Sequence, residues 1–188
     1  QSGGRESQVG IGDSSSLAAG TASGDSLPLF LQQLHGHGIG QLMLCSRPAG
    51  GVRLSCRPVE SVDGAAVSIR YTRDADVWLG VNPTNLKDRR GRGTVKDVAA
   101  LVTLFADLDV KPDACRDLEH AHLVADALDE LLSLKCTRLM SGNGLQLFVP
   151  LAQPLRIVDD ATRADAVALS RRWGALVALV ARDLGAGV

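Results

Sequence analysis

Two acidic side chains in the segment FADLDVK, Asp107 and Asp109, are the residues whose type and spacing most directly suggest chemistry. They end the apolar run LVTLF, which is typical of a buried strand. Residues i and i+2 of a strand point to the same face, so the two carboxylates are expected about 7 Å apart along the strand. Because like charges repel, a cation is expected between them. The alternative is a strand that simply ends on two solvated acids.

The cation that suits this pair is a hard divalent ion, Mg²⁺ or Mn²⁺, which takes carboxylate oxygens together with substrate phosphates. One or two such ions can bind a triphosphate and serve in-line nucleotidyl transfer. Asp107 and Asp109 are therefore candidate catalytic and metal-binding residues.

A second segment, SGNG at 141–144, lies between two predicted strands, 136–140 and 145–149. Its glycines let the backbone approach a ligand closely or turn back with exposed amides, as phosphate-binding loops do. The same letters also fit an ordinary hairpin turn, because Asn-Gly is the strongest short hairpin signal. Gln146 follows two positions after the second glycine.

The elements that must position these residues indicate an α+β domain over 27–188 with a mostly antiparallel sheet flanked by helices. Residues 1–26 are rich in Gly and Ser and are expected to form a flexible leader. Thr94 should begin a short helical segment with Asp97 as its capping-box acid. Further predicted elements are helices over 27–35, 118–134 and 159–184, strands over 39–47 and 101–108, and a hairpin of 67–71 with 77–82.

Composition sets limits on function. The chain has 20 Lys and Arg against 21 Asp and Glu, so any site for a polyanion must be local. The four cysteines show no CxxC spacing, so free thiols in a reducing cytoplasm are expected. No apolar run reaches about 18 residues, which predicts no membrane partner. The tryptophans, Trp78 and Trp173, are expected in the core or an interface, and the histidines mostly on the surface or in loops.

The combination of an apolar strand ending in DxD, a helix, and a strand-SGxG-strand unit resembles the catalytic domain of the archaeo-eukaryotic primase superfamily. These are primase-polymerases of phages, plasmids and mobile elements. The resemblance implies an RRM-like core in which Asp107 and Asp109 bind the catalytic metals. It also implies that the second motif binds the incoming nucleotide, here through Ser141, Gly142, Asn143, Gly144 and Gln146.

Gln146 is a departure from that family, in which the second motif is typically SGxGxH. A glutamine can donate a hydrogen bond to a phosphate oxygen, but it cannot carry a positive charge or shuttle a proton at neutral pH.

The resemblance extends upstream to an arginine-rich loop and downstream to a third acid. Arg89, Arg90 and Arg92 are candidates for nucleotide or template phosphate contacts, with a solvated basic loop as the alternative. Asp159 or Asp183 is the candidate for the third metal ligand. An Arg/Pro/Gly segment that the family places after this acid is absent, so a catalytic domain truncated at its C-terminal end is expected.

The function implied is a template-dependent nucleotidyltransferase, a DNA primase or polymerase in replication of a phage, plasmid or mobile element. Its cofactor would be Mg²⁺ or Mn²⁺. Its partners would be a single-stranded DNA template, nucleoside triphosphates and a helicase domain or protein, and its location would be cytoplasmic.

Two other functions are left open. One is a primase-like module that binds DNA in replication initiation without catalysis. The other is a haloacid-dehalogenase-like phosphatase, because ADLDV fits the DxDx(T/V) signature and 158–160 imitates a late acidic motif. In that case Asp107 would be the nucleophile and Asp109 a general acid. The phosphatase would require a lysine between Ser141 and Asp159, where the chain has none.

Overall fold

The computed structural model describes residues 26–187 except 73, 87–90 and 92, and within these residues the chain forms an α+β structure with two sheets. The expected leader lies outside the described residues apart from Ser26, which begins the first helix. The elements in order are α1 (Ser26–His35), β1 (Leu42–Pro48), β2 (Ser55–Val59), α2 (Val62–Tyr71), β3 (Ala75–Leu79), the 3-10 helix η1 (Val95–Asp97), β4 (Ala100–Asp109), α3 (Leu118–Leu132), β5 (Thr137–Met140), β6 (Gly144–Arg156) and α4 (Asp160–Asp183).

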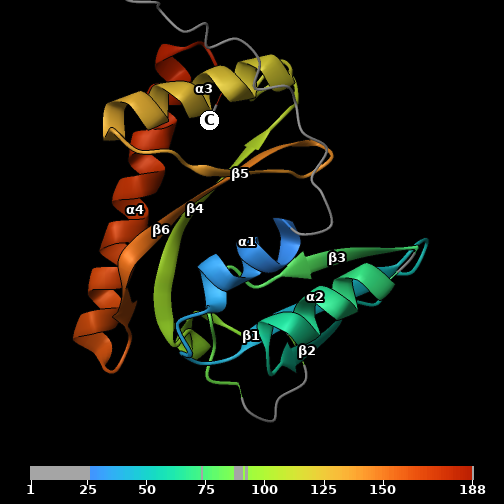
Figure 1. Cartoon of the computed structure of the whole chain (residues 1–188). Coiled ribbons are helices and arrows are strands. Elements are labelled where there is room, and N and C mark those ends of the chain that lie inside the picture. The colour runs from blue at the N-terminus through green and yellow to red at the C-terminus, as the bar shows by residue number, and fades with distance from the viewer. Residues whose placement is uncertain (1–25, 73, 87–90, 92, 188) are drawn as a thin grey trace, which may run out of the picture.

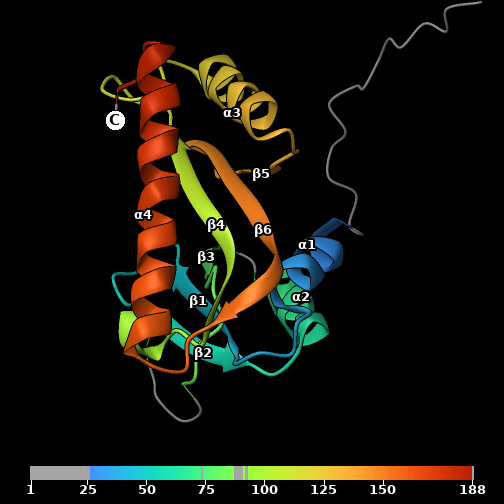
Figure 2. The same ribbon diagram turned by 90° about the vertical axis from the view of Figure 1, so that its left-hand side faces the viewer.

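The larger layer is an antiparallel sheet of order β4-β6-β5 that packs one face against α3 and α4. Figure 2 shows β4 and β6 between α4 on one side and α1 on the other. Alternate residues of each strand point to the helix-covered face, which gives this layer an aliphatic core. The core includes Leu108, Leu145, Leu147, Val149, Val124, Leu128, Trp173 and Val177.

The smaller layer is an antiparallel sheet of order β2-β1-β3, with α1 and α2 packed on one of its faces. Leu42 of β1 is buried with Leu31 of α1 and with Ala65 and Ala66 of α2. In Figure 1 this layer lies to the right of the lower half of β4, with α1 above β1. Phe30 of α1 contacts Phe148 of β6 edge to face at 5.0 Å, so α1 joins the two layers.

Most predicted elements are confirmed, including the strand that carries the two aspartates and the hairpin that follows it. The capping box at Thr94 and Asp97 is also present, although it starts only one 3-10 turn. The predicted hairpin of 67–71 with 77–82 is wrong, because residues 67–71 form the end of α2 and β3 pairs with β1. The Ser61 side chain accepts a hydrogen bond from the Gly64 N–H and caps that helix. β2 was not predicted.

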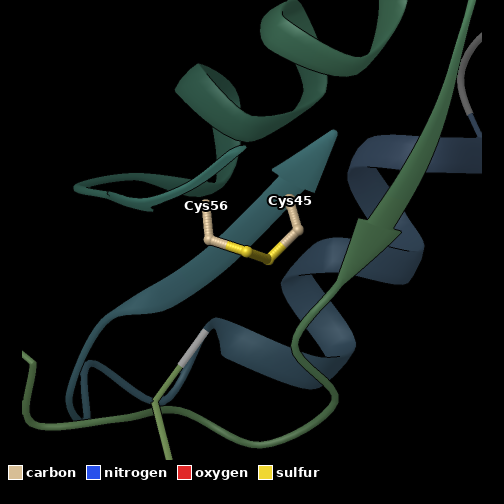
Figure 3. Close-up of a disulfide and its surroundings, with 2 residues drawn as sticks. All are labelled: Cys45 and Cys56. Carbon is tan, nitrogen blue, oxygen red and sulfur yellow. A yellow bond between two sulfur atoms is a disulfide. The ribbon is translucent and has the colours of Figure 1, made fainter. Parts of the chain in front are cut away.

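The expectation of free thiols is wrong for one pair of cysteines. Cys45 of β1 and Cys56 of β2 are directly opposite each other in the strand register and form a disulfide with an S–S distance of 2.06 Å. Figure 3 shows this bond linking the two strands. Cys115 and Cys136 are free and buried, as expected for reduced thiols.

Two histidines expected at the surface or in loops are instead buried or largely buried, and they join elements. The His120 Nε2–H lies 3.0 Å from the Leu184 carbonyl oxygen, which connects the start of α3 to the end of α4. His35 Nε2 lies 3.0 Å from the Gly80 carbonyl oxygen, and burial lowers the pKa of His35 to about 4. Among the described helices, none is both long and apolar enough to cross a membrane.

Candidate active site

Asp107 and Asp109 lie at the end of β4, and their side chains share one face of the sheet, as predicted. Asp107 is paired with Gln146 of β6 and Asp109 with Gly144. Their neighbour Leu108 points the other way, into the core shared with α3 and α4. The carboxylates therefore lie on the face that α3 and α4 do not cover.

Electrostatics distinguish the two carboxyl groups. The pKa of Asp107 is raised, first by partial burial and then by repulsion from Asp109, while a hydrogen bond from Gln146 and the charge of Lys111 act in the opposite direction. Asp109 forms an ion pair with Lys111, with 2.8 Å between its Oδ2 and the lysine Nζ. A bound cation would relieve the repulsion between the two acids.

The SGNG segment forms the turn of the β5–β6 hairpin and is fixed against the end of β4. The Ser141 N–H donates to the Gly144 carbonyl oxygen at 3.1 Å, which closes the turn. The Val110 N–H donates to the Asn143 carbonyl oxygen at 2.8 Å, which joins the turn to the chain just after Asp109.

Each glycine of this turn is required by a different feature of the backbone. Gly142 has a φ of +89°, a left-handed conformation that side chains other than Gly adopt at a cost. Gly144 lies so close to β4 that a Cβ atom would overlap the Leu108 carbonyl oxygen. The hairpin explanation for these residues is thus correct, and the turn also places Ser141 and Gln146 beside the aspartates.

A cleft of about 590 Å³ opens at this place, between the larger sheet and the smaller one. Its polar lining consists of Asp109, Ser141, Asn143 and Gln146. The rest is mainly apolar and includes Phe105 and Phe148 of the larger sheet, Phe30 of α1, and Trp78 of β3. An apolar cavity of this size with a few polar groups at one end is typical of a small-molecule site.

The structure does not bring the candidate third acids to this cleft. Asp159 follows the end of β6 that pairs with the start of β4, and because β4 has 10 residues its two ends are about 30 Å apart. The Asp159 carboxylate instead caps α4 by accepting from the Thr162 N–H at 2.8 Å. Asp183 ends α4, which packs on the opposite face of the sheet from the aspartate pair.

The chemistry of the donors can be compared with what a divalent cation needs. Within the described part of the chain, no group of three or more His, Cys, Asp or Glu side chains could hold a metal ion. Two carboxylates on one face, with the Gln146 amide beside Asp107, still supply the oxygen donors with which a protein holds Mg²⁺ when substrate phosphates complete the shell. The pair therefore fits one such ion.

The remaining predicted residues belong to the arginine-rich loop. Two other residues of the site were not predicted. Arg89, Arg90 and Arg92 lie outside the described residues. Lys111 was not singled out, although its position two residues after Asp109 predicts the ion pair. Phe105 was also missed, although it precedes Asp107 by two positions and so shares its face of the strand.

Comparison of the chain with protein-family models, with curated proteins and with solved structures finds no match in any of the three.

Proposed function

We propose that this chain is a template-dependent nucleotidyltransferase, a DNA primase or polymerase that acts in replication of a phage, plasmid or mobile element. The observation that supports the proposal is the cleft of about 590 Å³, which is lined by Asp109, by the SGNG turn, by the Gln146 that pairs with Asp107, and by aromatic rings. Its volume suits one nucleotide.

In this proposal Asp107 and Asp109 hold a divalent cation at the polar end of the cleft. When bound, the ion supplies positive charge that neutralises the triphosphate and activates the attacking 3′-hydroxyl. A second ion would have to take most of its ligands from phosphate and water, because the described residues offer no third carboxylate here.

The other residues of the cleft bind and orient the nucleotide. The Ser141 hydroxyl and the Gln146 amide N–H groups can donate hydrogen bonds to phosphate oxygens. Phe105 and Phe148, whose ring centroids are 5.2 Å apart, form the apolar surface against which a base can pack. Gln146 cannot donate a proton to the leaving pyrophosphate, so that proton would come from water.

The experiment is primer synthesis and extension with Mg²⁺ or Mn²⁺, a single-stranded template and labelled nucleotides. Asp107→Asn removes one metal-binding carboxylate, so we expect activity to fall at least about 100-fold. Asp126→Asn on α3 is the matched control, because Asp126 is an exposed acid outside the cleft, and its activity should be unchanged. Absence of synthesis by the unchanged protein would contradict the proposal.

One observation favours a second function, a primase-like module that binds DNA without catalysis. Lys111 already neutralises Asp109 through their ion pair, so one of the two acidic charges is balanced without a metal. DNA binding without synthesis would support this function. The phosphatase is less favoured because its late acid, Asp159, caps α4 at the far end of β4. Release of phosphate from a small phosphomonoester would support it.

A further inference from the structure

A second groove of about 500 Å³ lies on the face of the smaller sheet opposite α1 and α2. Cys45 is opposite both Cys56 and Trp78 in the strand register, so the disulfide and the indole share this face. Val52 and Leu54, from the connection between β1 and β2, border the groove and are both exposed. The face thus combines a covalently linked strand pair with an accessible aromatic ring.

Trp78 carries the chemistry of this groove. Its side chain is 43% exposed, which is unusual for an indole that serves only to fill a core. The guanidinium of Arg47 lies over the ring, 5.1 Å from the centroid. Asp76 forms an ion pair of 2.6 Å with the same guanidinium. Trp78 was expected in the core or an interface, and its exposure excludes the core.

The groove borders the candidate active site along β3, the edge strand of the smaller sheet. Trp78 and Leu79 line both the groove and the cleft that contains Asp109. A chain that crosses the exposed face of the smaller sheet and passes Trp78 would therefore lie beside the cleft.

We infer that this face binds single-stranded nucleic acid, with a base stacked on Trp78 and a backbone phosphate near Arg47. Aromatic rings accept any base, and an arginine beside them provides both stacking and charge for the phosphate. Arg53, which lies between Val52 and Leu54 in the sequence, is exposed and adds positive charge to the connection between β1 and β2. The inference rests on the proposed function only in identifying the bound strand as the template.

The test is fluorescence anisotropy with a labelled oligo(dT) of about 20 nucleotides, in EDTA and without nucleoside triphosphates. Stacking on one aromatic ring is worth enough that Trp78→Ala should weaken binding by about tenfold. Trp78→Phe keeps a stacking surface and should recover most of the affinity. Leu123→Ala is the control, because Leu123 is an exposed apolar residue on α3, outside the groove.

Two further readouts separate binding from general effects on structure. Arg47→Gln should weaken binding a few-fold and should reduce the slope of log K against log salt concentration by about one. Arg182→Gln, at the end of α4, should change neither quantity. Since Trp173 is only 5% exposed, quenching of the intrinsic fluorescence by oligo(dT) should report Trp78.

The outcomes distinguish this inference from the proposed function. Asp107→Asn should bind oligo(dT) normally while losing synthesis. Binding without synthesis by the unchanged protein would contradict only the nucleotidyltransferase. The inference is overturned if the unchanged protein does not bind oligo(dT). It is also overturned if Trp78→Ala binds as well as Leu123→Ala, or if duplex of the same length binds equally well.

Discussion

Two acidic sites border the larger sheet, and their electrostatic environments differ sharply. Asp129 of α3 is buried and receives hydrogen bonds from the Cys136 N–H at 2.7 Å and from Arg138 at 2.6 Å. Burial alone would raise its pKa, yet these partners hold the pKa of Asp129 at about 2. Asp107 is exposed, has another acid beside it, and has a raised pKa.

This contrast separates an acid that stabilises the fold from an acid that is available to a ligand. The oxygens of Asp129 are already bonded to groups of the protein, so its charge stabilises the fold and has little left for a ligand. Among the described residues, the Gln146 amide and the charge of Lys111 are the groups that offset the charge of Asp107. An acid whose negative charge is only partly offset by neighbouring groups, and which lies beside a cleft, is a candidate functional group.

The largest expected effect on stability comes from removing the charge of Asp129. Asp129→Asn leaves the partly buried Arg138 without one of its two carboxylate partners, so we expect a loss of about 3 kcal/mol in the free energy of unfolding. Urea denaturation measures it. Asp126→Asn removes the other partner, which is 60% exposed, and should cost less than about 1 kcal/mol. Asp107→Asn should cost nothing, and an equal loss there would contradict the comparison.

The two sites should also respond to pH in opposite directions. The pKa of Asp129 is about 2 in the folded protein and about 3.9 when unfolded, so its stabilisation of roughly 2 to 3 kcal/mol is present above pH 4 and lost as pH falls toward 2. Asp107 has a raised pKa, so ionisation above about pH 4 favours the unfolded state. Asp107→Asn should therefore gain stability relative to the unchanged protein as pH rises from 3 to 7. If the stability of Asp107→Asn relative to the unchanged protein instead increased as pH fell, the raised pKa of Asp107 would be contradicted.

Added Mg²⁺ should bind at Asp107 and Asp109 and should not bind at Asp129. A ligand that binds only the folded state stabilises it by about 1.4 kcal/mol at ten times its Kd. We therefore expect Mg²⁺ or Mn²⁺ to raise the melting temperature without any nucleotide, and Asp107→Asn or Asp109→Asn to abolish the increase. Asp126→Asn should retain it. If Asp107→Asn were stabilised as much as the unchanged protein, the ion would be bound elsewhere.

The smallest expected effect is the change in Mg²⁺ affinity on removing Lys111, which forms an ion pair with Asp109. Lys111 competes with a metal ion for the same carboxylate, so Lys111→Met should bind Mg²⁺ a few-fold more tightly in titration calorimetry. Lys135→Met is the matched control, because Lys135 pairs with Asp129 at the other site. Weaker binding by Lys111→Met would show that the lysine supports the metal site.

The part of the fold that sequence could predict is the part fixed by strong local patterns. The strand ending in Asp109 and the helix after it follow from long apolar periodicity. The segment 67–71 was misassigned because Val, Ile and Tyr favour strands, whereas Ser61 capping and the burial of Ala65 and Ala66 give a helix. Local propensity was overridden by packing against α1.

The candidate site was predictable only where neighbours in sequence are neighbours in space. The shared face of Asp107 and Asp109 follows from the two-residue repeat of a strand. The disulfide of Cys45 with Cys56 depends on the register of β1 with β2, which spacing does not reveal. Asp159 looked like a metal ligand, but the same residue type is favoured as a helix cap, and only the pairing of β6 with β4 decides between the two.

Gly144 has a consequence for recognising relatives of this chain. At Gly142 the turn needs only a positive φ, and asparagine or aspartate can supply that at modest cost. At Gly144 the obstacle is the backbone of β4 itself, which no choice of side chain can avoid. Sequences that keep this hairpin against this strand should therefore vary at Gly142 while retaining Gly144. The second glycine of SGNG is thus the better position on which to anchor a search.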